Sequence, residues 1–152
     1  PLSRNRGVCW ATTMDEKAVA VTPASPADLD AVSALLAPQM ENKLLLKRSR
    51  QQVEDLLQAG FVAREGGRVI GFAAVEIYSS KLAEIQCLAV HPDWQQRGVG
   101  KQLVGCCIDL ARRENVLELM AISSRDEFLV SCGFDYSLPG QKRALFIQTR
   151  QD

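Results

Sequence analysis

Apolar residues recur along the chain in two kinds of pattern, and each predicts a type of element. Residues 1–17 show no period and are expected to form a loose arm, and a valine-rich run then predicts a strand at 18–22. Apolar residues spaced three and four positions apart next predict helices at 26–36 and from 50 to about 60. The first third of the chain therefore predicts one strand and two helices.

Short motifs mark where these helices should begin and end. Ser25 followed by Pro26 is typical of a helix start, and Ser49 with Gln52 forms a capping-box pattern. Pro38 lacks the N–H that a helix interior needs, so it predicts the end of the first helix.

The rest of the chain mixes strands and helices. A Gly-Gly turn joins strand-like runs at 61–65 and 68–78 and predicts a hairpin, and alternation predicts a further strand at 82–90. The later elements are expected to be a helix at 98–113, a strand at 116–122, a helix at 127–131 and a strand at 142–149. This order indicates an α/β (α+β) fold with a central mixed sheet that is not doubly wound.

Composition limits the partners. The 152 residues suit one domain, expected at 18–152, and 18 Lys and Arg balance 18 Asp and Glu. Such a balance gives no basic field for nucleic acid or an anionic membrane, and no apolar run has the length of a bilayer span or a secretory signal. We therefore expect a cytoplasmic protein that binds a small molecule.

Cysteine and histidine usage argues against metal chemistry. Five cysteines without a C-x-x-C pair favour neither a disulfide framework nor a zinc cluster. His91 is the only histidine, and it precedes a proline in a turn. A metal site or a nucleophile activated by histidine would have to use this one residue, so neither is favoured. No metal is expected.

The loop at 95–101 carries the clearest chemical signal. It follows a strand and opens a helix, where unpaired backbone N–H groups and the helix dipole favour a phosphate or pyrophosphate. Gly98 and Gly100 fit neither the dinucleotide fingerprint, which needs a third glycine, nor the P-loop.

The flanks of this loop show which family it resembles. Val90-His91-Pro92 followed by Gln95-Gln-Arg-Gly-Val-Gly100 resembles the acetyl-CoA motif of the GNAT family of N-acetyltransferases. The run at 128–134, an aromatic residue followed by Gly-Phe, also fits that family. The resemblance covers about residues 18–150 and implies a mixed sheet, splayed at the acetyl-CoA site, with helices on both faces. Family members often dimerise through sheet edges, so a homodimer is one expected assembly.

The same resemblance makes acetyl-CoA the co-substrate. The backbone of Leu88 and Val90 would bond the pantetheine arm, and the N–H groups of the loop would bind the diphosphate. The residues that it assigns to acetyl-CoA are Leu88, Ala89, Val90, Gln95, Gln96, Arg97, Gly98, Val99, Gly100 and Lys101.

One departure from the family pattern points to the acceptor. The tyrosine that usually serves the family as an acid is replaced by Leu129, and the acetyltransferase domain of bacterial N-acetylglutamate synthases also lacks it. Segments 45–50, 83–92 and 122–125 are similar to that domain. The resemblance implies transfer to a small amino acid, L-glutamate first, as in arginine biosynthesis. Those synthases carry an amino-acid-kinase domain ahead of this one, and 152 residues leave no space for it. Feedback by arginine through such a domain is therefore not expected from this chain.

Two arginines are the candidate acceptor-binding residues by this resemblance. Arg48 and Arg125 would hold the carboxylates of a diacid, because guanidinium groups bind carboxylates in a bidentate way. Each could instead be a surface residue, Arg48 on a solvated basic face and Arg125 at a helix start.

Three residues are candidates for the chemistry. Glu84 would take a proton from the acceptor ammonium, Cys87 would lie near the thioester, and Ser124 would donate to the substrate or to the departing thiolate. Glu84 could instead be a solvated strand residue and Cys87 a small packing residue. Alternation along the strand places Glu84 and Leu88 on one face and Cys87 on the other.

Two other functions stay open. A GNAT acetyltransferase for another amine or a peptide N-terminus would not need the two arginines. A non-catalytic acyl-CoA sensor would fit the absence of tyrosine at position 129.

Overall fold

The computed structural model describes residues 10–11, 19–136, 140 and 143–151. They fall into two compact units, Pro1–Ile122 and Ser123–Asp152. Within the expected N-terminal arm only residues 10–11 are described. A single domain over 18–152 stays a prediction.

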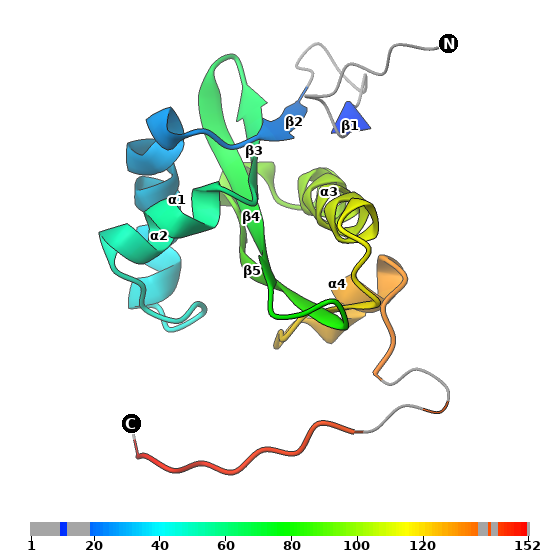
Figure 1. The fold of residues 1–152 in the computed structure, drawn as a ribbon. Helices are drawn as coiled ribbons and strands as arrows, with labels where there is room; N and C mark the ends of the chain where they lie inside the picture. Colours follow the sequence, from blue (N-terminus) through cyan, green and yellow to red (C-terminus); the bar gives the residue numbers. More distant parts are fainter. Residues whose placement is uncertain (1–9, 12–18, 137–139, 141–142, 152) are drawn as a thin grey trace, which may run out of the picture. The chain divides into compact units, whose positions relative to one another are not determined.

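The first unit is built on a mixed sheet (Figure 1). Its strands lie in chain order: β1 (Trp10–Ala11), β2 (Ala20–Pro23), β3 (Gly60–Glu65), β4 (Arg68–Ile77), β5 (Leu82–Val90) and β6 (Glu118–Met120). Neighbours run antiparallel from β1 to β5, whereas β6 runs parallel to β5. The expected hairpin and the strand at 82–90 are confirmed, and β6 is shorter than the predicted 116–122.

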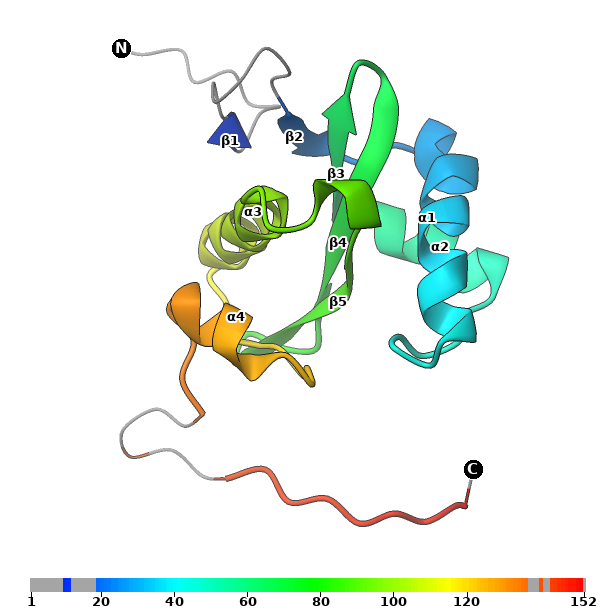
Figure 2. The same ribbon diagram turned by 180° about the vertical axis from the view of Figure 1, so that it is seen from behind.

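Helices cover both faces of this sheet. The turn η1 (Pro26–Asp28), α1 (Leu29–Glu41) and α2 (Arg50–Leu57) lie on one face and α3 (Val99–Arg113) on the other (Figures 1 and 2). On the α1/α2 face the core cluster comprises Val32, Leu36, Val53, Leu57, Val62, Phe72, Ala74, Cys87 and Ala89. On the α3 face the helix approaches Gly71 of β4 so closely that a Cβ there would lie 3.0 Å from Cδ1 of Leu103. The mixed sheet with helices on both faces is confirmed.

Pro38 does not end the first helix, contrary to the sequence-based prediction. α1 continues to Glu41, and the Pro38 carbonyl still accepts the N–H of Asn42 at 3.0 Å. A proline withdraws only its own N–H, which would have bonded to the carbonyl one turn earlier. Because Pro38 is exposed and close to the helix end, one missing bond leaves the last turn intact.

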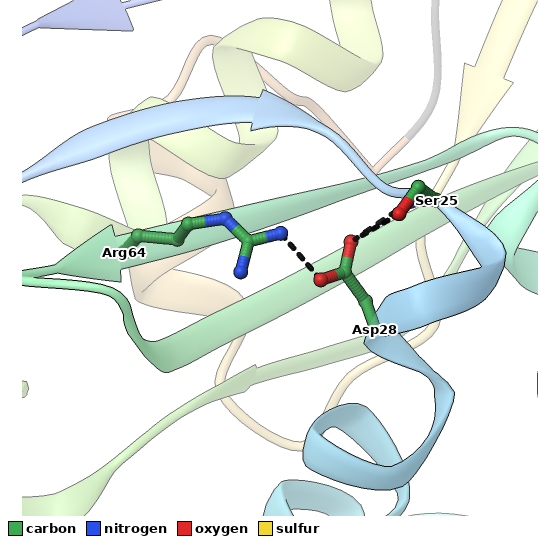
Figure 3. Close-up of polar contacts among 3 residues, drawn as sticks. All are labelled: Ser25, Asp28 and Arg64. Carbon is green, nitrogen blue, oxygen red and sulfur yellow. Dashed lines mark hydrogen bonds and ion pairs between the residues drawn. The ribbon is translucent and has the colours of Figure 1, made fainter.

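An almost buried carboxylate ties the start of α1 to the sheet (Figure 3). Asp28, only 5% exposed, accepts the N–H of Ser25 at 2.8 Å and a hydrogen bond from the Arg64 guanidinium of β3. Burial raises the pKa of the Asp28 carboxyl, but the bonds from Arg64 and Ser25 outweigh it and lower this pKa below its ordinary value. The ionised form of Asp28 therefore stabilises the fold.

We expect Asp28→Asn to lower the free energy of unfolding by about 2 kcal/mol at pH 7, because Arg64 loses its charged partner. A carboxyl whose pKa is lower in the folded state stabilises the fold fully at pH values above its unfolded-state pKa, about 3.9. This stabilisation is lost as the pH falls below that value and the carboxyl becomes protonated. Urea unfolding from pH 7 to about pH 2 should show the two proteins converging in acid. A difference that persists unchanged at the lowest pH would contradict this role.

The second unit contains α4 (Asp126–Ser131), close to its predicted place. The predicted strand at 142–149 is wrong: residues 143–149 lie outside any strand, and residue 142 is not described. A strand needs a neighbour to pair with its backbone groups. The described part of this unit offers no strand to pair with, and Leu145, Phe146 and Ile147 are exposed.

Candidate functional site

β5 contains a bulge at a residue that the sequence marked for chemistry. Phe72 pairs with Ala89 and Ala74 with Gln86, so Cys87 and the residue after it face a single residue of β4. Cys87 has a φ of 56°, a left-handed conformation that is uncommon outside glycine. Such bulges bend a strand and redirect its side chains.

The bulge overturns the expected alternation. Glu84 lies opposite Glu76, two residues along β4 from Ala74, so these side chains share the α1/α2 face. Cys87 belongs to the same cluster as Ala74 and therefore lies on the face of Glu84, whereas Leu88 lies on the other. The predicted faces of Cys87 and Leu88 relative to Glu84 are wrong because one extra residue resets the period of two.

Past Glu84, one edge of β5 is open. β6 pairs with β5 only from Leu82 to Glu84, so in the described chain residues 85–90 have no strand beside them on that edge. An extended amide chain can add to such an edge by main-chain hydrogen bonds. Leu88, Ala89 and Val90, expected to bind pantetheine, lie on this open part.

The loop after β5 turns through η2 (Pro92–Trp94) into α3. Gln96 and Gly98 both adopt left-handed backbone, with φ of 62° and 82°, and Gly98 is the N-cap of α3. A Cβ on Gly98 would meet no atom within 4 Å, so the space over the helix start is open. The first N–H groups of α3, from Val99 onward, have no acceptor within the helix, which suits a pyrophosphate.

Side chains of the loop complete its surface. Gln95 donates through Nε2 to the carbonyl of Val90 at 3.1 Å, so a pantetheine amide would share this acceptor. The Arg97 guanidinium lies 4.9 Å from the centre of the Trp94 ring, which holds it by a cation–π contact. Lys101 is exposed in the first turn of α3. Both cations lie within three residues of the Gly98 cap.

A hydrogen-bonded network lies on the α1/α2 face. Arg48, from the segment before α2, donates through Nη2 to Oε1 of Gln86. The Gln86 amide donates to Oε2 of Glu76 at 3.1 Å, and the Tyr78 hydroxyl donates to Oε2 of Glu84 at 2.6 Å. Nε2 of Gln86 also donates to the Tyr78 hydroxyl at 3.3 Å, so Gln86 of β5 and Tyr78, which follows β4, join Arg48 to Glu84.

Sequence reasoning missed Glu76, Tyr78 and Gln86. A signal was present, because polar residues spaced two apart at the end of one hairpin strand face those at the start of the next. The hydrogen bond to Glu84, aided by partial burial and the charges of Glu84 and Glu76, raises the pKa of Tyr78 to about 12. The phenol is therefore a donor throughout the neutral range.

Arg48 also lines a small pocket between α1 and α2. The pocket measures about 200 Å³ and is lined by Ser33, Ala37, Met40, Arg48, Arg50 and Val53. Nε of Arg48 and Oγ of Ser33 are both buried without a hydrogen-bond partner in the described structure. Buried polar groups normally have partners, so these two are suited to a ligand acceptor or an ordered water.

Cys87 is buried beside Arg48. Burial raises the pKa of the Cys87 thiol, and the nearby Arg48 guanidinium offsets only part of that rise. The thiol is therefore neutral near pH 7, a state that suits packing or hydrogen bonding rather than nucleophilic attack.

Ser124 and Arg125 belong to the second unit. Both are exposed, and the Arg125 N–H donates to Oγ of Ser123 at 2.9 Å just before α4. In the same unit the Tyr136 hydroxyl donates to Asp126 at 2.6 Å. The roles given to Ser124 and Arg125 stay predictions.

The described residues form neither a metal-binding group nor a membrane-spanning helix. Their His, Cys, Asp and Glu side chains do not gather in groups of three or more that could hold a metal ion. Within the same residues, no helix combines the length and apolarity needed to cross a membrane.

Comparison with known proteins agrees with the fold and the loop. The model of the Acetyltransferase (GNAT) family matches residues 29–134. An amino-acid acetyltransferase of Neisseria meningitidis is 32% identical over 121 residues, which cover 78% of this chain and 28% of that protein. An uncharacterized N-acetyltransferase of Chlorobaculum tepidum is 32% identical over 108 residues, covering 71% of this chain and 70% of that protein.

A solved structure is also similar. N-acetylglutamate synthase from Neisseria gonorrhoeae, complexed with coenzyme A and N-acetyl-glutamate, is 31% identical with a TM-score of 0.69. The match covers 74% of this chain and 27% of that one. The chain thus spans less than a third of the length of the amino-acid acetyltransferases that it matches.

Proposed function

This chain belongs to the GNAT acetyltransferase family, and we propose that it transfers the acetyl group of acetyl-CoA to the amine of a small amino acid, L-glutamate first. The observation that supports this choice of acceptor is the position of Arg48. This residue lines a pocket, and its guanidinium donates a hydrogen bond to the bulged strand β5. The gonococcal relative holds coenzyme A and N-acetyl-glutamate, the two products of such a transfer.

Acetyl-CoA, which supplies the acetyl thioester, fits the loop and the open edge. The N–H groups at the start of α3 would bind the diphosphate, with Arg97 and Lys101 adding positive charge. The backbone of Leu88 and Val90 would bond the pantetheine arm along the part of β5 that β6 leaves open.

The acceptor needs carboxylate donors and a base. Arg48 and Ser33, each with a buried donor atom that has no partner in the described structure, line the pocket and are the proposed carboxylate donors, and Met40 and Val53 give it apolar walls. Arg125 lies in the second unit, and the carboxylate-binding role that the resemblance gives it stays a prediction.

Glu84 is the proposed base of the transfer. Glu84 takes a proton from the ammonium, directly or through water, so that the neutral nitrogen can bond to the acetyl carbon. The C–S bond breaks and the departing thiolate takes a proton; the resemblance names Ser124 of the second unit as its donor, and that role stays a prediction. The nitrogen loses a second proton as the amide forms, which balances the proton taken by the thiolate. The net change is one amide formed, one thioester broken, one thiol released and one proton released through Glu84.

The test is thiol release from acetyl-CoA across acidic, neutral and basic amino acids and a peptide amine. We expect glutamate to be preferred, and Arg48→Ala to raise the KM for glutamate about 30-fold, because a charge-assisted hydrogen-bond pair is lost. Arg48→Lys should recover only part of this loss, since ammonium cannot reproduce the planar fork.

Lys47→Ala, an exposed neighbour, is the matched control and should leave the KM unchanged. No preference for glutamate or aspartate would exclude the acceptor assignment and favour another amine. Tight acetyl-CoA binding by calorimetry, with no turnover of any amine, would favour an acyl-CoA sensor.

A further inference from the structure

We propose that Tyr78 is a positioning residue that fixes the carboxylate of Glu84 for proton abstraction. The inference rests on the proposed function, because it takes Glu84 as the base. The Tyr78 hydroxyl lies 2.6 Å from Oε2 of Glu84 and 3.3 Å from Oε2 of Glu76. A hydroxyl has one proton to donate, and the shorter contact directs it to Glu84.

The register of the hairpin explains why a donor is needed. Glu76 and Glu84 lie directly opposite each other on β4 and β5, and like charges in that position repel. Without donors between them, the Glu84 carboxylate would turn away from Glu76. Tyr78 therefore sets which rotamer of Glu84 is occupied.

Arg48 fixes the direction of the remaining hydrogen bonds. A guanidinium only donates, so the oxygen of the Gln86 amide must face Arg48 and its NH2 group must face β4. That NH2 group donates to Glu76 at 3.1 Å. Because Gln86 already donates a hydrogen bond to Glu76, the Tyr78 hydroxyl can donate its proton to Glu84.

The arrangement leaves one carboxylate oxygen for chemistry. Tyr78 holds Oε2 of Glu84, while no described residue donates to its Oε1. Glu84 is half-buried, so its side chain is partly open to an ammonium or a bridging water. The phenol of Tyr78 stays protonated in the neutral range, so it donates to Glu84 while its oxygen accepts from Nε2 of Gln86 at 3.3 Å.

A double-mutant cycle tests this inference. We expect Tyr78→Phe, which removes only the hydroxyl, to lower kcat about tenfold and to leave the KM for acetyl-CoA and the melting temperature unchanged. In a Glu84→Gln background the same substitution should change kcat less than about twofold, because the base that Tyr78 orients is gone. Tyr136→Phe removes the chain's other phenol hydroxyl and should be silent.

The outcomes separate this inference from the proposed function. The cycle is run with whichever amine is acetylated fastest, so a preference for an acceptor other than glutamate overturns only the acceptor assignment. An unchanged kcat in Tyr78→Phe, or equal losses in both backgrounds, overturns the role of Tyr78 while the acetyltransferase proposal stands. No turnover with any amine overturns both.

Discussion

Glu84→Gln is expected to lower kcat by about 10²–10⁴-fold, because general base catalysis typically contributes that much. Glutamine has nearly the same shape, and its oxygen can still accept the hydrogen bond that Tyr78 gives to Oε2 of Glu84. An amide cannot take a proton from an ammonium near neutral pH. The substitution therefore removes the base while keeping the network at the ends of β4 and β5.

The measurement is single-turnover and steady-state thiol release, with the melting temperature as a check on folding. Glu65→Gln provides a matched control, since Glu65 is also a half-buried strand glutamate but lies on β3, outside the network. A larger loss in Glu76→Gln than in Glu84→Gln would contradict the assignment and move the base to β4. A loss that appears only in the KM for the acceptor would instead make Glu84 a binding residue.

The sequence predicts most of the scaffold because the scaffold depends on local patterns. The capping box at Ser49 and Gln52 forms as expected, with the Gln52 N–H bonded to Oγ of Ser49 at 3.2 Å. The strand at 82–90 appears with the predicted bounds, and the glycine loop opens α3 at Gly98. Each depends on residues within a few positions of one another.

The parts that sequence reasoning missed depend on contacts between distant segments. The bulge at Cys87 is a property of how β5 pairs with β4, and a strict period of two conceals it. The bond between Arg48 and Gln86 spans 38 positions, and no local rule predicts it. The last strand was predicted from its local run of apolar residues, and such a run does not show whether a neighbouring strand is there to pair with it.

The hydrophobic cluster that packs against the bulged part of β5 also supports the site. Cys87 and Ala89 pack in the same cluster as Val53 and Leu57 of α2, the helix that follows Arg48. Loosening this cluster would disturb the position of Arg48 relative to β5. Phe72 is the largest fully buried side chain of the chain's described part and lies opposite Ala89.

Phe72→Ala is expected to lower the free energy of unfolding by about 3–5 kcal/mol, from lost apolar burial and the cavity left behind. The side chain is fully buried, and its Cε2 lies where a Cβ on Gly60 would come within 2.8 Å, so its surroundings are packed tightly. Domains of this size are stable by about 5–15 kcal/mol, so the loss is a large share of the total.

Urea unfolding of Phe72→Ala should show a lower midpoint with an unchanged slope. Phe146→Ala makes the same chemical change at a side chain that is 84% exposed, and it should cost less than about 0.5 kcal/mol. Phe72→Leu keeps much of the volume and should lose less than about 1.5 kcal/mol. Equal losses at positions 72 and 146 would mean that the cluster under the bulge is not the core that stabilises this unit.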